Sequence, residues 1–268
     1  MTAASYGVRE IEGGSPAASL IRRVGYAVVP PQEAGVDVPT IALAFDQARA
    51  AAEETLGRER LQAAGEGQSI RAPLLYDDAL LALAATPAVR ALALELLCPA
   101  FILNQQNGVS NPGDGETYVQ GAWHRDLPYQ HFTSSRPLAI NALFCIEDFT
   151  VETGATEVLI ASHKAETFPD EPVAAATSAQ VLAPAGSFLV MDAMLYHRGG
   201  RNRSGRERRA VNHVYSIPFI RQQIQFSALA ARDDLSPATR ALLLLDDPLP
   251  SSPRDYLEGR LRKRAREA

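Results

Sequence analysis

Cysteine is scarce in this sequence, and its scarcity excludes two kinds of site. Only two cysteines, Cys98 and Cys145, occur among the 268 residues. Two cysteines cannot form a disulfide framework or a cysteine-rich metal centre. Cys145 lies in the apolar run 142–146, which predicts a buried strand and a packed thiol rather than a reactive one. We therefore look to other residue types for the chemistry of this protein.

An excess of positive charge and a targeting segment are also missing. The net charge of −5 and the pI of about 5.6 argue against a general affinity for nucleic acid. The basic stretch near the C-terminus, residues 260–266, is expected to be the solvated end of a helix. The N-terminus lacks the basic start and apolar run of a signal peptide, and no apolar stretch is expected to approach a membrane span. We expect a cytoplasmic protein with neither a nucleic-acid nor a membrane partner.

The chain is long enough for one large domain and too short for two full enzymes. Residues 1–99 are mainly helical in character, with apolar residues at helical spacing. Between 100 and 220, short β-rich runs alternate with turn-forming segments, which predicts an antiparallel sandwich or barrel. Residues 221–268 are again helical in character. The sequence thus predicts a single domain, 1–268, with a mainly β core and flanking helices.

His124 and Asp126 are the first residues that suggest chemistry. On an extended chain, residues two apart point to the same side, so both side chains can reach one point. His197, shortly after the predicted strand 187–192, offers a third ligand. Two imidazoles and one carboxylate are the ligands of non-haem Fe(II) oxygenases. Alone, a His-x-Asp pair is more often a hydrogen-bonded surface pair, and the other histidines are structural by default.

The segment 197–211 contains six arginines. A turn with glycine and serine leads there into a predicted strand headed by Arg208 and Arg209. An arginine on this strand can return beside the metal and bind a carboxylate in a bidentate manner, which suits a dicarboxylate cosubstrate. On the arginines alone, a solvated basic loop explains the segment better.

Four ordered blocks of the sequence resemble the phytanoyl-CoA dioxygenase-like family of Fe(II)- and 2-oxoglutarate-dependent oxygenases. The resemblance covers about residues 20–220. The first block is His124-Arg125-Asp126, and the second, 154–164, is similar to the family's Asn-Gly-x-x-x-x-x-Pro-Gly-Ser-His-Lys segment. The third, 184–187, leads into the strand before His197. In the fourth, Asn202 and Arg208 stand five and eleven residues after His197, where the family has an asparagine and its 2-oxoglutarate arginine.

The sequence departs from the family's pattern in three places, which comprise four residues. Thr153 stands for the usual asparagine, and Ile160-Ala161 stands for the Pro-Gly pair, which affects a turn and not a ligand. Arg198 stands for the glycine that usually follows the second histidine. It predicts a more basic rim around the site.

The resemblance implies a double-stranded β-helix (jelly-roll, cupin-like) core at residues 100–220. It also implies Fe(II) held by His124, Asp126 and His197, with 2-oxoglutarate bound through Arg208, or through Arg209 if the strand register slips by one. With O2 and a small-molecule substrate, the products would be a hydroxylated compound, succinate and CO2. Related halogenases have a small residue in place of the carboxylate, so Asp126 favours hydroxylation over chlorination. Desaturation, epoxidation and ring closure stay open.

Further contacts are expected around this centre. Gln106 falls where family members contact the cosubstrate, which makes it a cofactor-binding candidate. Asn141 lies in an otherwise apolar strand and needs a partner if it is buried. It is a cofactor-binding candidate if it faces the barrel lumen, but a plain hydrogen bond to a neighbouring loop fits it equally well. The loop 127–136 is aromatic and polar, which suits a small polar or natural-product-like substrate. Its candidate substrate contacts are Tyr129, Gln130, His131 and Arg136.

Two other functions fit the sequence less well. A cupin-like metal enzyme with non-oxidative chemistry, an isomerase or hydrolase, would leave Arg208 without a purpose. A non-catalytic jelly-roll binding protein would have no need of an intact ligand set. The sequence carries no signal for the oligomeric state.

Overall fold

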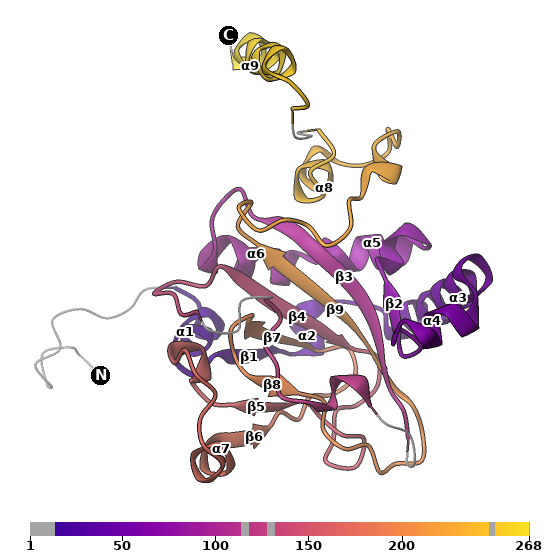
Figure 1. Cartoon of the computed structure of the whole chain (residues 1–268), viewed down its shortest axis with the longest axis vertical. Coiled ribbons are helices and arrows are strands. Elements are labelled where there is room, and N and C mark those ends of the chain that lie inside the picture. The colour runs from indigo at the N-terminus through magenta and orange to yellow at the C-terminus, as the bar shows by residue number, and fades with distance from the viewer. Residues whose placement is uncertain (1–13, 114–117, 128–131, 247–249, 268) are drawn as a thin grey trace, which may run out of the picture. The chain divides into compact units, whose positions relative to one another are not determined.

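The structure is a computed structural model that describes residues 14–113, 118–127, 132–246 and 250–267. It divides into two compact units, Met1–Ile224 and Gln225–Ala268. The first unit contains all the strands described below (Figure 1). It also contains the residues of the candidate site. It ends close to residue 220, where the sequence predicts the end of the β core.

The strands of the first unit form two antiparallel sheets. The larger sheet has the order β1-β7-β4-β9-β3-β2, and the smaller has the order β6-β5-β8. Most of their residues are buried, because helices cover one face of the larger sheet and the smaller sheet packs toward the other. The bounds are β1 Tyr26–Val29, β2 Ser69–Arg71, β3 Ile102–Asn111, β4 Ala139–Cys145, β5 Glu157–Leu159, β6 Ser178–Gln180, β7 Phe188–Asp192, β8 His197–Arg198 and β9 Arg208–Ser216.

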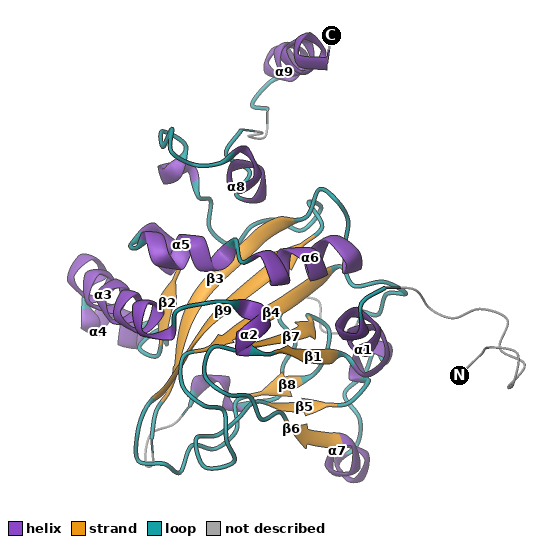
Figure 2. Cartoon of the chain, turned by 180° about the vertical axis from the view of Figure 1, so that it is seen from behind, coloured by secondary structure: helices purple, strands orange, loops and turns teal. Residues whose placement is uncertain are grey.

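Helices flank the sheets, as the sequence predicts. Figure 2 shows α5 and α6 crossing one face of the larger sheet, with α3 and α4 near its β2 edge. Capping side chains determine where several helices begin: the side chain of Asp37 caps α3, and that of Asp77 caps α5. The bounds are α1 Pro16–Val24, α2 Pro31–Ala34, α3 Val38–Leu56, α4 Arg58–Ala63, α5 Asp78–Ala84, α6 Pro87–Leu96 and α7 Glu171–Thr177, with 3-10 turns at Pro73–Leu75, Val119–Gly121 and Ser162–Lys164.

One segment, Asp78–Leu96, is long and apolar enough by composition to cross a membrane, with a mean hydropathy of 1.6. The expectation that no apolar stretch approaches a membrane span was therefore wrong. In the structure, Ala85 and Thr86 separate this segment into α5 and α6, and half of it is buried within the fold. Core helices acquire such a composition because they pack against a sheet.

The alternation of side chains along the strands gives the larger sheet two different faces. Tyr215 and His213 of β9 point toward the helices, where the Tyr215 hydroxyl donates to the carbonyl of Ala84 at 2.8 Å. On the other face, apolar side chains of β4, β7 and β9 join Val158 of β5 in a buried cluster. The register of β3 against β9 shifts between Leu103 and Gln105, which marks a β-bulge. The bulge decides which residues of β3 face the interior.

The second unit is helical. It contains a 3-10 turn at Ser227–Leu229 and the helices α8 Pro237–Leu242 and α9 Pro253–Glu267. Ser236 caps α8 by accepting a hydrogen bond from the backbone N–H of Thr239. The basic stretch 260–266 lies within α9, in agreement with the predicted helix.

Candidate metal centre

His124, Asp126 and His197 lie together at one end of the interior. One ligand atom from each lies within 4.8 Å of the other two, a spacing that suits a single metal ion. Nε2 of His197 is 3.8 Å from Oδ1 of Asp126, and the two imidazole rings have centroids 4.4 Å apart. The structure thus brings the three predicted ligands together. Their donor set fits Fe(II) in a three-ligand site that leaves positions open for other ligands.

Backbone hydrogen bonds fix the two histidines opposite each other. The N–H of His124 donates to the carbonyl of His197, and the N–H of His197 donates to the carbonyl of His124, both at 3.0 Å. The N–H of Asp126 donates to the carbonyl of Ala193, also at 3.0 Å. The ligand-bearing segment therefore runs antiparallel beside β8.

The second nitrogen of each histidine is also occupied. Nδ1 of His124 donates to the carbonyl of Ala122 at 2.8 Å, and Nδ1 of His197 donates to that of Leu195 at 3.0 Å. This tautomer leaves both Nε2 lone pairs for the metal. Burial lowers the pKa of His197, although the Asp126 carboxylate opposes the shift, so the neutral, ligating form is favoured.

Arg125, between the first two ligands, points away from the metal and holds their segment in place. Its guanidinium donates to the backbone carbonyls of Ser162, Ala165 and Glu166 and lies 4.0 Å from the ring centroid of Tyr196. The hydroxyl of Ser162 accepts from the N–H of Tyr196, the residue before His197. The segment that resembles the family's Ser-His-Lys block thus connects the two ligand-bearing stretches.

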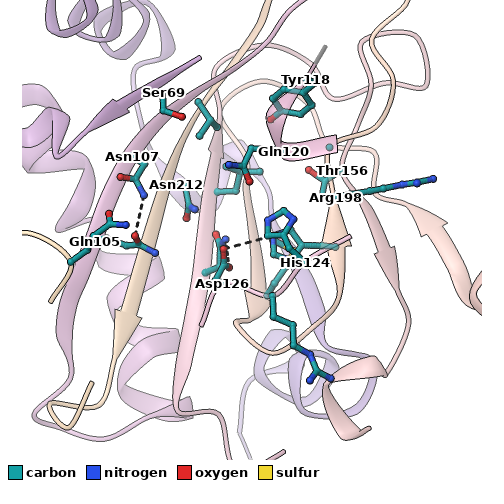
Figure 3. A pocket seen from close by; sticks show the side chains of 18 of the residues that line it. Ser69, Gln105, Asn107, Tyr118, Gln120, His124, Asp126, Thr156, Arg198 and Asn212 are labelled. Atoms are coloured by element: carbon teal, nitrogen blue, oxygen red, sulfur yellow. Dashed lines mark hydrogen bonds and ion pairs between the residues drawn. The ribbon is translucent and has the colours of Figure 1, made fainter. Parts of the chain in front are cut away.

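A polar cavity of about 220 Å³ opens beside the three ligands (Figure 3). Strands β3, β4, β7, β8 and β9 contribute side chains to it. Asn141 of β4 is one, and its Nδ2 donates to Oδ2 of Asp126 at 2.6 Å. Asn141 therefore lines the cavity, and its described contact is with a candidate ligand of the metal.

Arg208 lines the same cavity and is buried, with 2% of its surface exposed. Its guanidinium carbon lies 4.0 Å from the ring centroid of Phe149, and the Tyr118 side chain lines the cavity beside it. Nε and Nη1 have no hydrogen-bond partner among the described residues. Burial lowers the pKa of Arg208, but an arginine stays charged. A buried cation with unpaired donors fits the carboxylate of a ligand.

Arg209 points to the opposite face of β9. Its guanidinium pairs with Glu147 at 2.6 Å and with Asp46 at 2.7 Å. The structure thus places Arg208, and not Arg209, in the cavity. Arg198 pairs with Glu157 at 2.7 Å and stacks on Trp123, so the extra arginine after His197 adds little free charge to the rim.

The structure corrects the prediction for Gln106. Its Oε1 accepts from the N–H of Leu74, and its Nε2 donates to the carbonyl of Leu80, both at 2.7 Å. These partners lie on the helix-covered face, so Gln106 does not line the cavity. Its neighbours Gln105 and Asn107 do. The prediction missed both, because it rested on the family's pattern, whereas the register of β3 after the bulge sets which side chains face the cavity.

None of the four predicted substrate contacts is confirmed, for two different reasons. Tyr129, Gln130 and His131 lie outside the described residues. Arg136 is exposed and is not among the residues that line the cavity. Other lining residues were not predicted, among them Tyr118, Gln120 and Asn212. Only Asn212 had a signal in the sequence, since it lies four residues after Arg208 and so on the same face of a strand.

Comparison with known proteins agrees with this geometry. The family model of phytanoyl-CoA dioxygenase (PhyH) matches residues 21–210. The uncharacterised protein Rv1501 of Mycobacterium tuberculosis is 35% identical over 210 residues, which cover 76% of this chain and 75% of that protein. Dioxygenase af480 of Aspergillus fumigatus is 34% identical over 115 residues, covering 40% and 36% of the two chains.

Two solved structures share the fold. One is the non-haem α-ketoglutarate-dependent epimerase SnoN from nogalamycin biosynthesis, with a TM-score of 0.50 and 23% identity over 75% of this chain and 79% of that one. The other is the non-haem monooxygenase ThoJ in complex with nickel, with a TM-score of 0.56 and 20% identity over 75% and 77%. These likenesses confirm the predicted jelly-roll type of core. With the match over residues 21–210, they lead to one conclusion: the chain belongs to the phytanoyl-CoA dioxygenase family.

Proposed function

We propose that this protein is an Fe(II)- and 2-oxoglutarate-dependent dioxygenase that hydroxylates a small polar molecule. The observation that carries the proposal is Arg208, a buried guanidinium with unpaired donors in the same cavity as the three metal-ligand candidates. A metal site alone has no need of such a cation. A metal site that also binds a dicarboxylate does.

Each residue then has a defined task. His124, Asp126 and His197 bind the iron, which when bound supplies the activation of O2. Arg208 binds the distal carboxylate of 2-oxoglutarate, and the Tyr118 hydroxyl, which lines the same cavity, can donate its proton to that carboxylate. The overall reaction converts R–H, O2 and 2-oxoglutarate into R–OH, succinate and CO2, so one oxygen atom enters each organic product.

Asp126 supports hydroxylation over chlorination. Its carboxylate fills a ligand position that a halide would need, and the hydrogen bond from Asn141 holds it there. Named relatives support the oxidative chemistry. They include af480 and an iron/α-ketoglutarate-dependent dioxygenase, penM of Penicillium thymicola, which is 35% identical over 96 residues. A metal enzyme that does not use 2-oxoglutarate, whether an isomerase or a hydrolase, leaves the buried Arg208 unexplained, and so does a simple binding protein.

Anaerobic addition of Fe(II) and 2-oxoglutarate tests the proposal. We expect the weak visible absorption of an Fe(II)·2-oxoglutarate complex in the wild-type protein and its loss in the Asp126→Ala variant. Admission of O2 should then convert 2-oxoglutarate into succinate. A folded wild-type protein without this absorption, indistinguishable from Asp126→Ala, would contradict the proposal. A chlorinated product from the intact enzyme would contradict its hydroxylase part.

A further inference from the structure

Three asparagines form a row across the inner face of the larger sheet. They are Asn141 on β4, Asn212 on β9 and Asn107 on β3, and these strands are neighbours. Asn212 stands directly opposite Asn107 in the register, and Asn141 lies two residues before Leu143, the other partner of Asn212. Figure 3 shows Asn212 and Asn107 on the same side of Asp126, with Asn212 between Asn107 and Asp126 in that view. The row runs from the metal site outward along the cavity wall.

Each member of the row has a buried oxygen without a hydrogen-bond partner among the described residues. These atoms are Oδ1 of Asn107, Oδ1 of Asn141 and Oδ1 of Asn212. All three residues line the cavity, and Asn107 and Asn141 are at most 4% exposed. Buried carbonyl groups are rarely left unpaired, because their desolvation is unfavourable. The row therefore points to a ligand that brings hydrogen-bond donors.

The cosubstrate cannot be that ligand. At neutral pH, 2-oxoglutarate carries two carboxylates and a keto group, all of which only accept hydrogen bonds. It matches the donors of Arg208 and Tyr118 and has none to offer to the asparagine oxygens. Given the proposed function, the donors must come from the substrate, or from water that the substrate replaces.

The charges around the cavity favour a neutral substrate. Arg71 donates two hydrogen bonds to Glu66, at 2.9 and 2.6 Å, and Arg198 is paired with Glu157. Asp126 is the one carboxylate among the described residues that line the cavity, and it is a metal-ligand candidate. The described lining thus offers no free carboxylate to a cationic substrate. The guanidinium groups of Arg71 and Arg198 are already paired, so they do not favour an anionic substrate.

The spacing of the row favours neighbouring hydroxyl groups. Directly opposed residues of an antiparallel pair have their Cβ atoms about 4.5–5.5 Å apart. Two hydroxyls on adjacent carbons of a ring can therefore donate to Asn107 and Asn212 together. Hydroxyls also accept hydrogen bonds, so they suit the side chains of Ser69 and Gln105 on the same wall.

We propose that the substrate is a neutral polyhydroxylated molecule, such as a sugar or cyclic polyol unit, whose adjacent hydroxyls donate to Asn107 and Asn212. Asn141, beside Asp126, receives a further donor from the part of the substrate next to the metal. The carbon that reacts then lies within this hydroxylated part. A larger substrate extends beyond the cavity, since about 220 Å³ is less than the roughly 300–1,000 Å³ of a site for a drug-sized ligand.

The experiment uses the full chain with Fe(II) and 2-oxoglutarate under anaerobic conditions. The probes are the methyl glycosides of glucose, mannose and galactose, each paired with its fully O-methylated derivative, which keeps the acceptors and loses the donors. Calorimetry measures binding, and the iron absorption is recorded in parallel. We expect at least one glycoside to bind about tenfold or more tightly than its O-methylated partner, since two or more hydrogen bonds are lost.

Variants then locate the contact. Asn107→Leu and Asn212→Leu should each weaken glycoside binding about three- to tenfold, the effect of one neutral hydrogen bond. Asn107→Asp keeps an acceptor and should retain more of the affinity than Asn107→Leu. Gln62→Leu, an exposed position outside this cavity, is the matched control. Circular dichroism and thermal melting check the fold of each variant.

The proposal is overturned if no glycoside binds, or if the O-methylated derivatives bind equally well. Tighter binding of the corresponding amino sugar or uronic acid glycosides would also overturn it. The comparison of each glycoside with its O-methylated derivative in the wild-type protein tests the proposal even if a variant fails to fold. A failure of the proposed function looks different, because the iron absorption with 2-oxoglutarate is then missing before any glycoside is added.

Discussion

Nδ2 of Asn141 donates a 2.6 Å hydrogen bond to Oδ2 of Asp126, which leaves Oδ1 of that carboxylate facing His197 at 3.8 Å. The hydrogen bond thus selects the carboxylate oxygen that is available to the metal. It links β4 of the larger sheet to the loop segment that carries two of the three ligands. Such outer contacts orient the ligands of metal sites in general.

Removal of this contact should weaken metal binding. We expect Asn141→Leu to lower the affinity for Fe(II) about 10- to 100-fold, because the Asp126 carboxylate can then rotate. Competition with a chelator in anaerobic buffer measures the affinity, and Gln62→Leu serves as the control. Unchanged metal affinity in a folded Asn141→Leu protein would show that the hydrogen bond does not position Asp126.

The two adjacent arginines of β9 should behave in opposite ways toward 2-oxoglutarate. Arg208→Gln should cost about 2–5 kcal/mol of binding free energy, at least about thirtyfold in affinity, because the distal carboxylate loses its buried partner. Arg209→Gln removes the surface pairs with Glu147 and Asp46 and should change stability by about 1 kcal/mol or less. Titration of the iron absorption with 2-oxoglutarate measures the affinity of both variants, and we expect the affinity of Arg209→Gln to match that of the wild type. The reverse order of effects would move the carboxylate site to Arg209.

His213 predicts a pH dependence of stability. Burial lowers its pKa to about 4, while the carbonyl of Ala142, which accepts from Nδ1, opposes the shift. The unfolded chain takes up the proton near pH 6.5, so the contribution of His213 is complete above that pH and is lost as the pH falls toward 4. Between pH 6.5 and 5 the loss is about 2 kcal/mol.

Urea unfolding of the wild type and of His213→Gln at pH 7 and pH 5 isolates this contribution. Burial also raises the pKa of Asp192 to about 6, so its contribution to stability changes with pH in the opposite direction. This contribution is the same in both proteins and cancels in their difference. We expect the difference in unfolding free energy between the two proteins to shrink by about 2 kcal/mol at pH 5. A difference that does not vary with pH would mean that His213 is protonated in the fold.

Gly154, in the block that resembles the family's Asn-Gly segment, should tolerate no side chain. Its φ is +72°, and an added Cβ would lie 2.4 Å from the carbonyl oxygen of Gly200 and 2.7 Å from the amide nitrogen of Asn202. Gly205 has a similar φ of +68° with open space around it and serves as the control. Gly205→Ala should cost about 1–2 kcal/mol, and Gly154→Ala about 1–3 kcal/mol more, by urea unfolding. Equal losses would show that the backbone at Gly200 can move aside.

The parts of the site that local geometry determines were predictable. His124 and Asp126 are two residues apart on extended chain, so their common side follows from the backbone alone. His197 and Arg208 needed the order of blocks along the chain, because their positions depend on strand pairing over long distances in the sequence. The helices α5 and α6 were likewise predictable, since their apolar residues recur at helical spacing.

Other parts depended on features that a sequence does not display. The bulge near Asn104 breaks the simple alternation of β3, so Gln106 points toward α5 while Gln105 and Asn107 face the cavity. Tyr118 reaches Arg208 from an irregular segment before the ligands, and periodicity says nothing of such a contact. The row of asparagines required the register of three strands, which only the structure provides.

The reciprocal backbone hydrogen bonds between His124 and His197 affect how the site takes up and loses its metal ion. They fix the spacing of the two imidazoles when the chain folds, so little conformational entropy is lost when an ion arrives. Loss or exchange of the ion then requires only rotation of side chains. A zinc finger, in contrast, unfolds when its metal leaves. We expect a chelator to strip this protein to a folded apoprotein that accepts fresh iron at once.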